Sequence, residues 1–212
     1  MQSIGSFAIY IALYISLIGT ALSFVAGRTG SRRFIQASRF AVYAAYGALA
    51  VAGSVLLHAI LTHNFSIQYV AEFSDRSMPL FYLIGAFWGG QAGSLLFWVT
   101  VVGLFSSAAV YVNRDKHQDL MPWVQFVCLA VMSGLLLILA FVSNPFEGYQ
   151  VISDPTTGEG LNPLLQTPKM VIHPPSLLTG LATMTVPFGF ALAALITGNI
   201  DDRWVKAARK WI

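Results

Sequence analysis

Charge is scarce in this 212-residue chain. Only 10% of its residues are Asp, Glu, Lys or Arg, whereas soluble domains average about 25%. Hydrophobic residues make up 56% of the chain. A water-facing surface can hardly be built from this composition, so the sequence predicts an integral membrane protein. The net charge of +3 is spread over separate segments, which argues against a nucleic-acid-binding surface.

Several chemical motifs are also missing. The single cysteine, Cys128, has no partner for an internal disulfide, and no CxxCH sequence for covalent haem attachment is present. The sequence contains no recognisable nucleophile triad, phosphate-binding loop, paired carboxylates or zinc-ligand spacing. These motifs therefore give no basis for predicting a self-contained enzyme.

The chain instead contains five apolar runs that reach the ~20 residues needed to cross a bilayer as a helix. We expect one all-α transmembrane domain over residues 1–212, with a retained first helix rather than a cleaved signal peptide. No run contains Asp, Glu, Lys or Arg, which argues against an ion-coupled transporter. The third run is long, so we expect it to tilt or to begin at the interface. The five runs are Ile4–Val25, Phe40–Thr62, Pro79–Val112, Met121–Ser143 and Leu177–Gly198.

The connections between these runs differ in charge. Basic residues are concentrated in cytoplasmic connections of membrane proteins. Only Arg76 and Lys169 fall on one side, together with five acidic residues, so we expect that side to face outward. The N-terminus would then lie outside, and the C-terminus would lie in the cytoplasm. The opposite side holds ten basic residues: Arg28, Arg32, Arg33, Arg39, Arg114, Lys116, Arg203, Lys206, Arg209 and Lys210.

The predicted outer loop at residues 144–176 is long for a simple connection and ends in the segment LNPLLQTPKMVIHPPSLL. Within it, His173 precedes Pro174 and Pro175. We expect the prolines to exclude His173 from a helix and to begin the fifth helix just beyond it. The imidazole is either a surface side chain in a proline turn or a ligand for a metal or haem iron.

Two further features leave alternatives open. Trp88, Gly89 and Gly90 lie in AFWGGQAGSLLFW, where small residues admit either a neighbouring helix or a flat ligand. Pro187 is expected to kink the fifth helix. His58, near the outer end of the second helix, is either a helix-packing residue or a second ligand.

Two blocks of the sequence together indicate a family. NFSIQYVAEFSDRSMPLFYLIGAFWGGQAGSLLFW and LNPLLQTPKMVIHPPSLLTGLATMTVPFGFALAAL resemble the early part of the CcmF/NrfE family of cytochrome c haem lyases. The resemblance covers nearly the whole chain. It implies a role in cytochrome c biogenesis in the bacterial inner membrane, with the active face toward the periplasm.

The resemblance also implies roles for particular residues. His173 would be an outer-face ligand of haem b. Asn162, Pro163, Gln166, Pro174 and Pro175 would shape its loop, and Trp88, Gly89 and Gly90 would belong to the cofactor-binding region. Implied partners are the haem chaperone CcmE, a CcmH-type apocytochrome-delivery protein and apocytochrome c.

The chain departs from the family pattern in two ways. Gln91 and Ala92 stand where family members usually carry histidine and glutamate. The tryptophan-rich WWD segment is also missing, so we expect a split subunit or a fragment that shares its haem site with a WWD-bearing chain. The leading interpretation is the N-terminal part of a haem lyase that is inactive alone. The alternative is a non-catalytic structural or assembly subunit.

Overall fold

The computed structural model describes residues 1–147, 157–200 and 202–211. Within these ranges it is all-helical and contains no strand. Five of the described helical segments are long and apolar enough to cross a membrane. This result confirms the predicted all-α fold with five candidate spans. The middle of the predicted outer loop, residues 148–156, lies outside the described residues.

The first two spans form a long helical hairpin. Helix α1 (Gln2–Thr29) packs along α2 (Arg32–Leu61). Gly30 joins them in a left-handed conformation with φ 64°, and its N–H donates to the carbonyl of Ala26. Glycine adopts this conformation without the steric cost that other residues carry. Helix α1 extends past both ends of the predicted run Ile4–Val25, and α2 begins before the predicted run Phe40–Thr62. The apolar runs are shorter than the helices because the charged residues that flank them are also helical.

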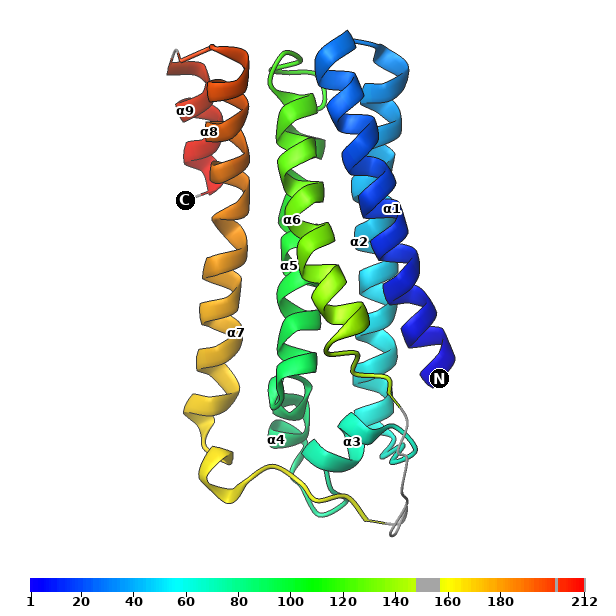
Figure 1. Ribbon diagram of the computed structural model, residues 1–212. Helices are drawn as coiled ribbons and strands as arrows, with labels where there is room; N and C mark the ends of the chain where they lie inside the picture. The colour runs from blue at the N-terminus through cyan, green and yellow to red at the C-terminus, as the bar shows by residue number, and fades with distance from the viewer. Residues whose placement is uncertain (148–156, 201, 212) are drawn as a thin grey trace.

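The third predicted run, Pro79–Val112, is not one helix. It divides into α4 (Leu80–Gly85), a single 3-10 turn η1 (Ala86–Trp88) and the spanning helix α5 (Gln91–Val112). A short helix, α3 (Gln68–Phe73), lies at the same end of the bundle (Figure 1). The expectation of one long helix was wrong because Gly89 and Gly90 interrupt it.

The remaining spans complete the bundle. Helix α6 (Met121–Phe141) packs on α1, α5 and the C-terminal span. That span consists of α7 (Pro168–Thr183) and α8 (Thr185–Thr197), which separate at Met184. Pro187 lacks the N–H that would bond to the carbonyl four residues earlier, which explains a break at this position. A turn η2 (Pro163–Leu165) precedes α7, and α9 (Asp202–Ala208) and η3 (Arg209–Trp211) follow α8.

The connections are divided between the two ends of the bundle. The N-terminus, α3, α4 and the start of α7 lie at one end, and the turns after α1, α5 and α8 lie at the other (Figure 1). Helices α5 and α6 stand between the α1–α2 hairpin and the α7–α8 pair. The buried core follows the same division. One apolar cluster includes Leu56, Leu96 and Phe146, and a second, nearer the C-terminal helix, includes Val124 and Phe190.

Candidate functional site

His173 lies inside α7, five residues after the helix begins at Pro168. The prediction that the two following prolines exclude it from a helix was therefore wrong. Proline is well tolerated at the first helical position, which lets α7 begin at Pro168. The imidazole is exposed, and it has no hydrogen-bond partner among the described residues. His173 is thus presented on an open helix face.

This helix face borders a groove of about 680 Å³. Positions 165, 168, 169, 172, 173 and 176 recur every three or four residues, which brings them to one side of the segment. We call them, with Leu164 and Thr167, the His173 face. Ile172 is 60% exposed and Leu164 is 84% exposed, so most of the surface of these apolar side chains is uncovered. The face comprises Leu164, Leu165, Thr167, Pro168, Lys169, Ile172, His173 and Ser176.

Pro174 and Pro175 both lie within α7 and are half-buried. Because proline has no N–H, the carbonyls of residues 170 and 171 lose their usual helical donors. On another side of the helix, Val171 is buried and packs closely against Gly85 of α4. This packing fixes the start of α7 against the bundle, and the His173 face remains open.

Asn162 and Gln166 stabilise the segment that precedes α7. The Asn162 side chain accepts a hydrogen bond from the Leu164 N–H at 3.0 Å, and the Gln166 side-chain amide donates to the Leu161 carbonyl at 3.0 Å. Leu161 is buried and contacts the backbone at Gly89. The two polar residues therefore act here on the loop backbone, and neither lines the groove beside His173.

Trp88, Gly89 and Gly90 belong to a different, densely packed region. The Tyr69 hydroxyl donates to the carbonyl oxygens of Phe87 (2.9 Å) and Ala86 (3.1 Å) and accepts from the Gly90 N–H at 3.0 Å. Burial raises the pKa of Tyr69, which keeps this donor protonated. We call Tyr69, Phe73, Phe87, Gly90 and Gly93 the Tyr69 cluster.

Close packing in the Tyr69 cluster requires glycine. A methyl group at Gly93 would stand 1.9 Å from the Phe87 carbonyl oxygen and 2.3 Å from the Tyr69 hydroxyl. Trp88 is half-buried beside this cluster, with its ring 5.7 Å from that of Phe97, and its indole N–H is buried without a partner among the described residues. None of Trp88, Gly89 and Gly90 lines the groove of the His173 face.

The other histidines lie apart from this groove. His58 is exposed beside a separate apolar groove along α2. His63 has φ 53° and its ring stands 5.9 Å from that of Phe65. His117 lies in the connection between α5 and α6, which is at the opposite end of the bundle (Figure 1). Within the described residues, no group of three or more His, Cys, Asp and Glu side chains is arranged to hold a metal. Gln91 is exposed at the start of α5.

Sequence reasoning missed two contributors. Lys169 lines the groove beside His173, and their four-residue spacing would have indicated a shared face if this segment had been assigned to a helix. Tyr69 gave no periodic signal, because its role depends on hydrogen bonds to residues 17 to 21 positions away.

Comparison with known protein families identifies the family of this chain. A family model described as cytochrome C assembly protein matches residues 88–211, more than half of the chain. The chain belongs to the cytochrome c assembly protein family. The match begins at Trp88 and includes α5 to α9, so it contains the His173 face and part of the Tyr69 cluster.

Relatives in this family match the whole chain, which corresponds to the N-terminal part of CcmF. The cytochrome c-type biogenesis protein CcmF of Pseudomonas aeruginosa is 34% identical over 211 residues, covering 100% of this chain and 32% of that protein. CcmF of Escherichia coli K12 is 32% identical with the same coverage. NrfE of Haemophilus influenzae is 30% identical over 158 residues, 74% of this chain and 25% of that protein.

A solved structure gives the same result for the fold. The structure titled cytochrome c heme lyase CcmF superposes with a TM-score of 0.83 and 26% sequence identity over 99% of this chain. The matched region is 33% of that chain. The chain therefore spans about a third of the length of the relatives it matches.

Proposed function

We propose that this chain is the N-terminal part of a cytochrome c haem lyase, as a separate subunit or as part of a longer protein. In this role His173 is an outer-face ligand of haem b, and the helices form the scaffold that presents it. The observation that supports the proposal is the exposed imidazole on an open, partly apolar groove, within the region that matches the family.

The groove fits part of a haem site. Its volume of about 680 Å³ falls within the range of cofactor pockets, and Leu164, Leu165 and Ile172 offer apolar contact. When bound, haem would supply an iron that an imidazole can ligate and vinyl groups that can be joined to cysteine thiols. Among the described residues that line the groove, His173 alone carries an imidazole. A WWD-bearing chain or downstream segment would complete the enclosure, so the isolated chain should bind haem weakly or not at all.

The orientation in the membrane follows from charge. The end of the bundle with ten basic residues in its connections would face the cytoplasm, and the N-terminus and the His173 face would lie at the periplasmic side of a bacterial inner membrane. This arrangement would make His173 accessible to the haem chaperone CcmE, a CcmH-type delivery protein and apocytochrome c.

A cell-based assay tests the function. In cells whose cytochrome c maturation depends on this chain, His173→Ala should reduce the yield of holocytochrome c by about tenfold or more. His117→Ala is the matched control, because it removes an imidazole at the opposite end of the bundle. Full yield from His173→Ala, with protein levels equal to wild type, would overturn the proposed ligand.

A structural or assembly subunit is the second candidate. The observation that favours it is that the His173 ring has no hydrogen-bond partner among the described residues, whereas haem- and metal-binding histidines usually have a partner that orients the ring. In that case His173→Ala would leave maturation intact, and truncation of α7 and α8 would abolish it through loss of the complex.

A further inference from the structure

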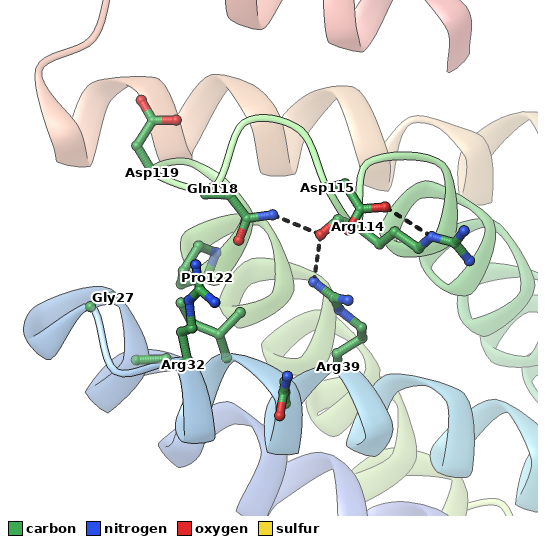
Figure 2. Close-up of a pocket in the computed structure, with 12 residues that line it drawn as sticks. Gly27, Arg32, Arg39, Arg114, Asp115, Gln118, Asp119 and Pro122 are labelled. Carbon is green, nitrogen blue, oxygen red and sulfur yellow. Dashed lines mark hydrogen bonds and ion pairs between the residues drawn. The ribbon is translucent and has the colours of Figure 1, made fainter.

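A second pocket lies at the opposite end of the bundle from His173. It has a volume of about 630 Å³ and lies between the first turns of α2 and the loop that follows α5. Three arginines line it, two from α2 and one from the loop (Figure 2). The complete lining is Ala26, Gly27, Gly30, Arg32, Ile35, Gln36, Arg39, Arg114, Asp115, Gln118, Asp119 and Pro122.

The Arg39 guanidinium forms one hydrogen bond, but its Nε donor has no acceptor among the described residues. Its guanidinium donates to the Arg114 carbonyl at 2.7 Å, and the Gln118 side chain donates to the same oxygen at 2.7 Å (Figure 2). The Nε atom of Arg39 is buried and has no partner among the described residues. A buried donor without an acceptor is costly, so this pocket favours an added acceptor.

Arg32 has a free guanidinium in the part of the chain that the structure describes. It stands seven residues before Arg39, about two turns along α2, so both side chains extend from the same side of the helix toward the loop (Figure 2). Arg32 also begins α2, and Ser31 provides no side-chain cap. The partial positive charge of the helix N-terminus therefore adds to that of the arginine.

The acidic residues of the pocket already have partners. Asp115 forms an ion pair with Arg114 at 3.1 Å, and an Asp119 carboxylate oxygen accepts a hydrogen bond from the Asn199 amide at 2.8 Å. Arg32 and Arg39 form no salt bridge among the described residues. Two arginines that share one side of a pocket match the geometry of a phosphate group.

We propose that this pocket binds the phosphate group of an anionic phospholipid through Arg32 and Arg39. The lining residues lie at the end of α1, the start of α2 and the connection from α5 to α6. These segments stand together at one end of the bundle (Figure 1), where a lipid headgroup would stand. Phe40, which follows Arg39 on α2 without lining the pocket, is 68% exposed and offers an apolar surface for an acyl chain. Basic pockets between transmembrane helices commonly bind anionic headgroups. The site is independent of haem and of the proposed lyase activity.

Native mass spectrometry of the full chain, released from micelles containing phosphatidylglycerol, tests the proposal. Wild-type protein should retain phosphatidylglycerol in preference to phosphatidylcholine. Arg32→Gln should weaken this retention about tenfold, the effect of losing one charge-assisted contact. Because the Arg32 side chain forms no hydrogen bond or salt bridge among the described residues, this variant should fold normally. Arg39→Gln should act in the same direction.

Arg33→Gln is the matched control. Arg33 is the adjacent residue of α2, carries the same charge and does not line the pocket, so retention should stay within about twofold of wild type. Equal losses from Arg32→Gln and Arg33→Gln would overturn the pocket in favour of general surface charge. Inorganic phosphate that competes as well as the lipid, at equal concentration, would overturn the lipid as the ligand.

Discussion

The Tyr69 cluster and the His173 face lie near the same end of the bundle but differ in how their residues are satisfied. In the Tyr69 cluster, backbone carbonyls and an N–H group bond to one buried hydroxyl, and glycines allow direct contact. On the His173 face, an imidazole, a lysine and apolar side chains remain open. The residues of the first region satisfy one another, whereas those of the second remain exposed, as the proposed ligand role of His173 requires.

The largest expected effect comes from filling the tightest contact in the Tyr69 cluster. Gly93→Ala places a methyl group 1.9 Å from the Phe87 carbonyl oxygen, and backbone must move to relieve the clash. We expect a loss of about 3 kcal/mol or more in the free energy of unfolding, measured in mixed detergent–SDS micelles. Gly134→Ala is the control, because a methyl group there meets no atom within 4 Å. Equal stability of both variants would contradict the packing described.

Leu161 connects the two regions, because it precedes α7 and packs against Gly89. Leu161→Ala should cost about 2–3 kcal/mol, since the loop can partly collapse into the space left behind. Leu164→Ala removes the same atoms from a side chain that is 84% exposed and should change stability by no more than about 0.5 kcal/mol. The same unfolding assay measures both, and similar values for the two would remove the distinction between the regions.

Tyr69→Phe isolates the hydrogen bonds of the cluster from its packing. The ring remains, but the Gly90 N–H loses its acceptor and two carbonyls lose a donor. We expect a loss of about 1–2 kcal/mol in thermal or SDS unfolding. Tyr14→Phe serves as the comparison, because Tyr14 is 61% exposed. A neutral Tyr69→Phe variant would show that packing alone maintains the cluster.

The smallest effect on stability is expected at His173 itself. The ring is exposed and has no partner among the described residues, so His173→Ala should alter the unfolding free energy of the isolated chain by no more than about 0.5 kcal/mol. A larger loss would show that His173 supports the fold, and it would weaken the proposed role as a ligand.

Composition and hydropathy were sufficient to predict the helical class and the five candidate spans, because membrane crossing imposes long apolar segments. The break in the third run could be suspected from its length and its two glycines, but its position depends on the Tyr69 hydroxyl. That contact joins residues 21 positions apart and produces no local periodicity.

The site residues remain predictions, whereas the backbone conformation expected at His173 was wrong. His173 could be singled out from its neighbouring prolines, but the same prolines led to the wrong backbone conformation. Local preference disfavours proline inside a helix, whereas membrane helices tolerate it when surrounding structure compensates. Arg32 and Arg39 contributed to the prediction only as basic residues of an expected cytoplasmic connection. The pocket that they line could not be predicted, because its shape depends on the loop at Arg114.

The absorption spectrum of haem in the purified assembly tests the central claim most directly. The chain would be purified together with the component that supplies the remaining family length, as wild type and as His173→Ala. We predict that the substitution removes or shifts the absorption bands of the haem bound at the outer face, while the assembly stays intact by size-exclusion chromatography. An intact His173→Ala assembly with the wild-type spectrum would contradict it.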